Sequence, residues 1–203
     1  GIYRELIRRC KEEGLDFSRV CSVNLDEYVG LGPDHDQSYR YFMDSNLFDH
    51  INIKPENTYV AKGTGDVEEN LREFRELIAA GETELQLLGL GADGHIAFNE
   101  PGEVLWDQAH QEKLDESTID ANSRFFASRD LVPRSAVTMG IGEIMRAKKL
   151  LLIISGANKE EASKRLLMSG EISTSCPVTL IKLHRDATVF ISRELAEAIG
   201  YTG

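Results

Sequence analysis

A glycine-rich turn in the middle of the chain carries the residue types that proton transfer requires. The run from Gly89 to His95 is followed by Glu100, so Asp93 and Glu100 flank one imidazole in the sequence. A carboxylate on one ring nitrogen fixes the tautomer of a histidine, and the other nitrogen can then exchange protons near neutral pH. The pattern predicts a proton shuttle built from Asp93, His95 and Glu100.

Two other interpretations of this turn remain open. His95 could be a core histidine bonded to the backbone, with Asp93 as a turn or helix-cap carboxylate. His95 could also bind zinc together with Asp93, Glu100 or the distant His110 or His184, but the Asp-Gly-His spacing does not suit one helical face and no HExxH pair occurs. The Gly-x-Gly-x-x-Gly spacing lacks the acidic partner of a dinucleotide site. We therefore expect neither a metal nor another cofactor.

An earlier acidic pair could supply a second proton-transfer group. Asp26 and Glu27 end an apolar run, and adjacent strand residues point to opposite faces, so only one of the two can enter a pocket. A partly desolvated carboxylate has a raised pKa and can take a proton from carbon near neutral pH. The alternative is a helix cap or a salt bridge in a loop.

Two isolated cations could hold a small anion. Arg124 lies in the run Ala121-Asn122-Ser123-Arg124-Phe125-Phe126, and Lys159 follows the Gly156 turn at the expected start of a helix. A helix N-terminus offers free amides and a partial positive charge, so an added lysine there suits a phosphate. Each cation could equally be an ordinary surface charge.

The composition is that of a globular protein and limits the class of partner. The chain has 203 residues, a net charge of −11 and 41% hydrophobic residues. A nucleic-acid or anionic-membrane surface needs clustered Lys and Arg, which this acidic balance does not favour. The three cysteines lie far apart and are odd in number, which indicates free thiols and favours the cytoplasm. No apolar run approaches the roughly 18 residues of a membrane span.

Alternating apolar periods predict the elements that position these residues. The predicted strands are Val20–Leu25, Glu84–Leu90, Lys149–Ile154, Thr179–Leu183 and Thr188–Ile191, and the predicted helices are one at the amino terminus, Asp66–Ala80 and Asn158–Met168. This alternation favours an α/β fold with an open, mostly parallel sheet covered by helices on both faces, Rossmann-like and three-layered. We expect one domain over residues 1–203, with a polar segment at 102–117 that is either a lid or a solvated connection.

Four stretches together resemble the glucosamine-6-phosphate deaminase family over essentially the whole chain. They are Asn24–Leu31, Ser38-Tyr39 with Phe48–His50, Gly94–Pro101 and Ala121–Phe126. The run Asp-Gly-His-Ile-Ala-Phe-Asn-Glu-Pro is highly specific. The related 6-phosphogluconolactonases usually continue the Asp-Gly-His core with Thr-Ala-Ser, and they carry Arg where this chain has Tyr28. Both features favour the deaminase.

The resemblance implies a metal-free aldose–ketose isomerisation that turns glucosamine 6-phosphate and water into fructose 6-phosphate and ammonia. Such an enzyme is a hydrolase of amino-sugar catabolism. The matched site residues are catalytic Asp26, Asp93, His95 and Glu100, and phosphate-binding Arg124 and Lys159. Asp26 resembles the base that moves a proton from C2 to C1. His95 resembles the acid/base that opens the pyranose ring, tuned by the two neighbouring carboxylates.

Two features depart from the family's usual pattern. Members usually carry a strand and a Gly-rich phosphate loop ahead of the helix that opens this chain, so we expect that an amino-terminal segment is missing and the phosphate site weakened. Allosteric hexamers show a Ser-Arg-Thr-Arg run where this chain reads Trp106–Lys113, so we expect no activation by an amino-sugar phosphate. A monomer and a homo-oligomer are both open. A lactonase with His95 activating water, and a non-catalytic sugar-phosphate sensor, are the alternatives.

Overall fold

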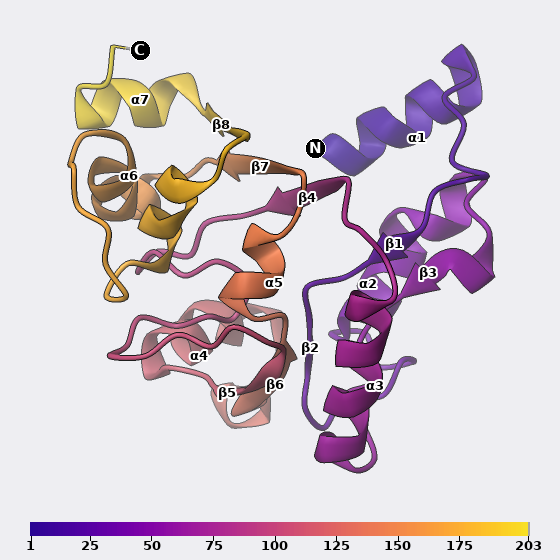
Figure 1. Cartoon of the computed structure of the whole chain (residues 1–203). Helices are drawn as coiled ribbons and strands as arrows, with labels where there is room; N and C mark the ends of the chain where they lie inside the picture. The colour runs from indigo at the N-terminus through magenta and orange to yellow at the C-terminus, as the bar shows by residue number, and fades with distance from the viewer. Residues whose placement is uncertain (203) are drawn as a thin grey trace. The chain divides into compact units, whose positions relative to one another are not determined.

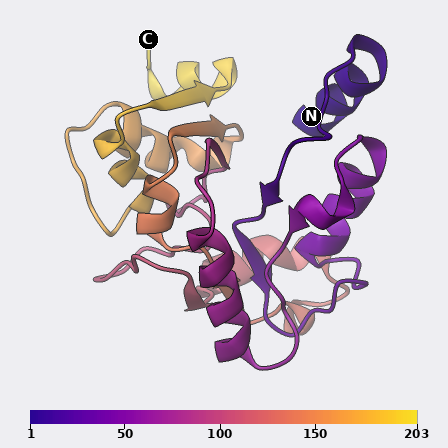
Figure 2. The same ribbon diagram turned by 45° about the vertical axis from the view of Figure 1, so that its right-hand side comes forward.

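Helix α3, Val67–Ala79 (Figures 1 and 2), contains one of the points at which the chain passes between two compact units, after Arg72. The computed structural model describes residues 1–202. The first unit holds residues 1–72 and 115–137, and the second holds residues 73–114 and 138–202. Leu71 and Phe74 are buried at 2% and 3% exposure, as the apolar stripe of the predicted helix requires. The expectation of one domain over residues 1–203 stays a prediction.

Helix α1, Ile2–Glu13, opens the first unit and packs through one apolar stripe. It ends at Gly14, whose φ of 73° lets its amide donate a hydrogen bond to the carbonyl of Arg9. Side chains of α1 cover a buried cluster formed by Met43, Leu47, Phe48 and Ile53; the covering residues are Tyr3, Leu6 and Ile7.

The acidic pair lies at the start of β2, one of the short strands of the first unit. The further elements are β1 (Ser22–Val23), β2 (Asp26–Tyr28), α2 (Tyr39–Asn46), β3 (Thr58–Tyr59), α4 (Glu116–Asn122) and β6 (Ser135–Thr138). Strands β1 and β3 pair in parallel. Strand β2 neighbours β6, and the amide of Val29 donates to the carbonyl of Ser135 at 3.0 Å. Ser38 caps α2 by accepting a hydrogen bond from the amide of Tyr41 at 3.0 Å.

A parallel three-stranded sheet organises the second unit, in the order β4-β7-β8 (Figure 1). The elements are β4 (Leu85–Leu88), β5 (His110–Lys113), α5 (Ile141–Met145), β7 (Lys149–Ile154), α6 (Glu160–Leu167), β8 (Ala187–Ile191) and α7 (Arg193–Ile199). Leu150, Leu152 and Ile154 alternate along β7 and are at most 1% exposed. Helices α6 and α7 pack together beside this sheet.

The mixed α/β fold with mostly parallel strands is confirmed, and one predicted strand is wrong. Residues Pro177–Leu183 form a 3₁₀ helix instead of a strand at Thr179–Leu183. Pro177 favours a helical first turn, and the hydroxyl of Thr179 donates to the carbonyl of Cys176 at 2.7 Å, which closes that turn. A short apolar run has no period that distinguishes the two structures.

The polar segment at 102–117 contains a strand, β5, and is held near its middle. The carbonyls of Trp106 and Asp107 accept hydrogen bonds from the amides of Ile141 and Glu143 at 2.8 and 3.1 Å. A lid role for this segment stays a prediction. None of the helices in the described part of the chain combines the length and apolar character that crossing a membrane requires.

Candidate active site

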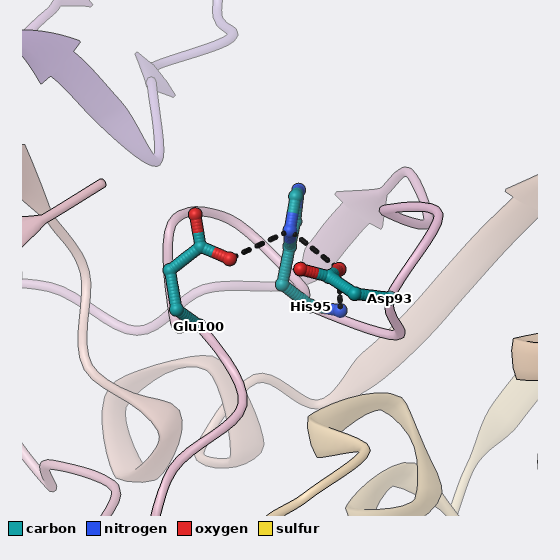
Figure 3. Close-up of side chains that lie close together, drawn as sticks. All are labelled: Asp93, His95 and Glu100. Carbon is teal, nitrogen blue, oxygen red and sulfur yellow. Dashed lines mark hydrogen bonds and ion pairs between the residues drawn. The ribbon is translucent and has the colours of Figure 1, made fainter. Parts of the chain in front are cut away.

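Three side chains of the predicted proton shuttle meet in the loop that follows β4. Figure 3 shows Asp93 and Glu100 approaching the same ring nitrogen of His95 from opposite sides. The Nδ1 atom lies 2.8 Å from Asp93 Oδ1 and 3.1 Å from Glu100 Oε2. The structure therefore brings together the three residues that the sequence pattern placed in one turn.

The two carboxylates fix the tautomer of His95. Both are acceptors, so Nδ1 must carry a proton and donate it to them. Asp93 Oδ1 also accepts a hydrogen bond from the His95 backbone amide at 3.1 Å, which holds the carboxylate in place. Among residues 1–202, Nε2 of His95 has no hydrogen-bond partner. Nε2 is therefore the nitrogen that can exchange a proton with a bound molecule.

The carboxylates also set the charge of His95. Burial alone would lower the pKa of His95, but its hydrogen bonds to Asp93 and Glu100 outweigh burial and raise that pKa to about 9. Burial acts to raise the pKa of Asp93, but its hydrogen bond to His95 holds it well below the usual range. At neutral pH His95 is an imidazolium, so the cluster can act as a proton donor.

Close backbone packing holds the imidazole in this position. A Cβ atom on Gly91 would lie 2.5 Å from the His95 ring, so the loop approaches the ring as only glycine permits. Gly94 has a φ of +98°, and a Cβ there would lie 2.5 Å from Cys176 Sγ. The carbonyl of Gly94 accepts a hydrogen bond from the amide of Val178 at 2.8 Å. The segment after α6, which contains Cys176 and Val178, thus packs against the loop and holds it in place.

The loop turns sharply just before Glu100. Ala97 has a φ of 52°, a left-handed conformation that costs a non-glycine residue about 1–3 kcal/mol. Asn99 offsets this cost, since its side-chain amide donates to the carbonyls of Ile96 and Met139 at 3.0 and 2.9 Å. Glu100 is only 6% exposed, and its Oε1 atom has no partner in the described part of the chain. The strain and the unpaired oxygen both lie beside the imidazole, as at a functional site.

The same cluster could hold a divalent cation. One imidazole nitrogen and two carboxylate oxygens, all within 4.8 Å of one another, form a donor set that zinc accepts. The cation would replace the shared proton on Nδ1 of His95. The metal hypothesis and the proton hypothesis therefore compete for one position, and chelation separates them.

In the first unit, the adjacent carboxylates Asp26 and Glu27 have different surroundings. Glu27 is 2% exposed, and its oxygens accept hydrogen bonds from the amides of Tyr28, Tyr39 and Arg40 at 2.8 to 3.0 Å. It binds the N-terminus of α2 and has a structural role. Asp26 is half-buried. Burial raises the pKa of the Tyr28 and Tyr39 hydroxyls, and the negative charge of Asp26 raises it further.

The two predicted phosphate-binding cations occupy short helical turns. Arg124 lies in the turn Ser123–Phe125 of the first unit, is exposed, and has its guanidinium 4.6 Å from the Phe125 ring centroid. Lys159 ends the turn Ala157–Lys159 of the second unit, directly before α6, and is half-buried. Their roles as phosphate ligands stay predictions, as does the role of Asp26.

A family model described as "Glucosamine-6-phosphate isomerases/6-phosphogluconolactonase" matches residues 1–190. The chain belongs to this family. Within the family, it is 54% identical over 201 residues to a glucosamine-6-phosphate deaminase of Clostridium perfringens, covering 98% of this chain and 83% of that protein. It is 44% identical over 198 residues to glucosamine-6-phosphate deaminase 1 of Bacillus subtilis, covering 97% of this chain and 81% of that protein.

Two solved structures show a similar fold. A monomeric glucosamine-6-phosphate deaminase superposes with a TM-score of 0.93 at 44% identity, covering 97% of this chain and 82% of that one. A 6-phosphogluconolactonase from Thermotoga maritima gives a TM-score of 0.67 at 20% identity, covering 94% and 78%. The second likeness shows the fold alone. The family predicted from the motifs is confirmed.

Proposed function

We propose that this chain is a glucosamine-6-phosphate deaminase, which converts glucosamine 6-phosphate and water into fructose 6-phosphate and ammonia. One observation carries the proposal: identity of 54% and 44%, over nearly the whole chain, to deaminases of two bacteria. The TM-score of 0.93 to a monomeric deaminase supports it. The enzyme is a hydrolase that acts on a carbon–nitrogen bond of an amino-sugar phosphate.

His95 opens the sugar ring in this proposal. Breaking the bond between C1 and the ring oxygen requires a proton on that oxygen and removal of a proton from the C1 hydroxyl. An imidazolium can donate from Nε2 to the ring oxygen and then take the hydroxyl proton, so it ends as it began. The hydrogen bonds that Asp93 and Glu100 accept from Nδ1 support this role, since they stabilise the charged ring.

Asp26 carries the isomerisation. A carboxylate takes the proton from C2 and returns it to C1, while the C1 carbonyl oxygen gains a proton and the amine nitrogen loses one. The aldehyde thus becomes a C1 hydroxyl, and an imine replaces the amine at C2. Water then hydrolyses the imine, releasing ammonia and leaving the ketone of fructose 6-phosphate. One base must reach both carbons, which positioning of the substrate makes possible. The Asn24–Leu31 motif, within which Asp26 begins β2, supports this assignment.

Arg124 and Lys159 bind the phosphate group of the substrate. Both match family positions by motif, and both are cations in a chain whose net charge is −11. A guanidinium can bind phosphate oxygens bidentately, whereas an ammonium acts as a point charge. We expect either alanine variant to raise KM more than it lowers kcat, because a contact present in the ground state is lost.

Product analysis tests the proposed function against its alternatives. Purified protein is incubated with glucosamine 6-phosphate, and separately with 6-phosphogluconolactone. Ammonia and fructose 6-phosphate in equal amounts from the first substrate are the expected result. Lactone hydrolysis without ammonia would assign a lactonase, and saturable binding of the amino-sugar phosphate without turnover would assign a sensor.

The cellular setting proposed is a cytoplasmic enzyme with a small-molecule substrate. The three cysteines are free thiols, which supports a reducing compartment. The solved deaminase that superposes with a TM-score of 0.93 is described as monomeric, which supports a monomer over a homo-oligomer. Sedimentation at several protein concentrations tests the monomer.

A further inference from the structure

Tyr28 is the centre of a buried aromatic cluster in the first unit. It is 4% exposed, and its ring stacks on Tyr39 with centroids 5.4 Å apart and planes 16° apart. The edge of the ring meets Phe126 at 6.1 Å and 82°. Its hydroxyl shares hydrogen bonds with the side chains of Tyr39 and Asn122. A buried phenol normally finds such polar partners, and here they come from two distant parts of the sequence.

These contacts connect two segments that carry candidate site residues. Tyr28 ends β2, the strand that begins with Asp26. Asn122 ends α4, and the turn Ser123–Phe125 that contains Arg124 follows immediately. Tyr28 therefore contacts the residues on both sides of the turn, with a hydrogen bond before it and a ring contact after it.

We propose that Tyr28 is a positioning residue, which holds the Arg124 turn at a fixed distance from the Asp26 carboxylate. The inference rests on the proposed function, in which Arg124 binds the phosphate and Asp26 moves the proton. A substrate held at its phosphate presents C2 to the base only if both protein groups keep their separation. An error of about 1 Å in such positioning can cost about 100-fold in rate.

The chemistry of the cluster suits a fixed support and not a proton carrier. Burial, more than the neighbouring charges of Asp26 and Glu27, raises the pKa of Tyr28 to about 12, so its hydroxyl stays protonated. Both rings are rigid, with two rotatable bonds each, so holding them costs little conformational entropy. Tyr28 does not exchange protons with the substrate in this proposal.

The test removes the Tyr28 hydroxyl and keeps the ring. In Tyr28→Phe the stacking on Tyr39 and the edge contact remain, but the bond to Asn122 is lost. We expect kcat for ammonia release to fall about 10–100-fold, while the inhibition constant of inorganic phosphate stays within about twofold, since Arg124 still binds it. Arg124→Ala should weaken phosphate inhibition instead.

A matched control separates this effect from loss of a buried hydroxyl in general. Tyr3 belongs to the same unit, is partly buried, and packs on Phe42 with ring centroids 6.2 Å apart. Tyr3→Phe should leave kcat and KM unchanged. Wild-type kcat in Tyr28→Phe would overturn the proposal, and so would a loss of phosphate affinity equal to that of Arg124→Ala.

Two further measurements keep the proposal distinct from the proposed function. In a double-mutant cycle, Asn122→Ala should add little to the loss in Tyr28→Phe, because both remove the same bond. Amide hydrogen exchange of residues 123–126 should be faster in Tyr28→Phe than in wild type. Exchange needs no activity, so unchanged exchange overturns the inference, whereas a wild-type protein that releases no ammonia overturns the function.

Discussion

At neutral pH, His95 carries a charge because two carboxylates share its Nδ1 proton. Removing one of them in Asp93→Asn lowers the pKa of His95, since a hydrogen bond to the charged ring is weakened. In the proposed mechanism the imidazolium of His95 opens the sugar ring, so kcat/KM should fall as the pH rises through about 9 in the wild type. In the variant this alkaline limb should move down by roughly one pH unit.

A pH profile of ammonia release measures this shift. Asp186→Asn is the control, because Asp186 is an exposed carboxylate of the same unit outside the His95 cluster. Its alkaline limb should match that of the wild type. An unchanged limb in Asp93→Asn would mean that another group sets it.

In the proposed mechanism Asp26 and His95 act at different steps, so their variants should fail differently. Asp26→Asn should lower kcat by about 10²–10⁴-fold, because no other group moves the C2 proton. His95→Gln blocks ring opening, so supplying substrate in an open-chain form should restore part of its activity. The measurement is the ratio of rates with cyclic and open-chain substrates. Equal ratios for both variants would contradict the assigned steps.

The proton on Nδ1 of His95 occupies the position that a divalent cation would take. If the proton is the working occupant, dialysis against EDTA should leave kcat unchanged, and added Zn²⁺ should inhibit by displacing it. Ammonia release before and after dialysis provides the comparison. Loss of activity on chelation that Zn²⁺ restores would assign a metal enzyme.

At the scale of elements, Gly94 in the loop after β4 is constrained by its backbone angle and by a close contact, whereas Gly30, which follows β2, is constrained by its backbone angle alone. Gly94→Ala places a Cβ 2.5 Å from Cys176 Sγ and forces alanine to a φ of +98°. Gly30→Ala has a similar φ of +100° but nothing within 4 Å of its Cβ. Backbone strain should cost both variants about 1–3 kcal/mol of unfolding free energy.

The clash with Cys176 adds a cost in Gly94→Ala alone. Urea unfolding of both variants should therefore show the larger loss for Gly94→Ala, and Cys176→Ala in the same chain should recover the difference. Equal losses would show that the loop moves away from Cys176 at no cost.

The elements that the sequence predicted correctly are those with long or clear periods. The strand predicted at Lys149–Ile154 matches β7. This strand lies between β4 and β8, and every second side chain of its apolar run is buried. The apolar run at Thr179–Leu183 is a 3₁₀ helix because Pro177 and the Thr179 hydroxyl decide its conformation, and apolar spacing does not record either effect.

Site contacts between residues close in sequence were predictable, whereas contacts between distant residues were not. Asp93, His95 and Glu100 were predictable as a group because they share one turn. The bonds of Glu27 to α2, and those of Tyr28 to Asn122, join residues far apart in the chain. No spacing in the sequence indicates these contacts. The only local signal is that Tyr28 directly follows the two carboxylates Asp26 and Glu27.

At the scale of the whole molecule, the net charge of −11 favours the protonated, positively charged form of a buried group. Exposed ion pairs, such as those of Arg8 with glutamates of α1, each add little to stability. The ion pair of His95 with Glu100 is much less exposed, since the His95 side chain is 20% exposed and the Glu100 side chain 4% exposed. The protonation of His95 therefore affects the stability of the folded chain.

Folding raises the pKa of His95 from its usual 6.5 to about 9, so the folded chain binds this proton more tightly than the unfolded chain. The resulting stabilisation is complete below about pH 6.5 and is lost as the pH rises through about 9. We expect the free energy of unfolding to fall by on the order of 3 kcal/mol across this interval. Urea melts at closely spaced pH values measure it. His95→Gln should flatten the dependence, whereas His35→Gln, at an exposed histidine, should retain it; equal slopes in His95→Gln and wild type would show that the cluster does not hold the proton.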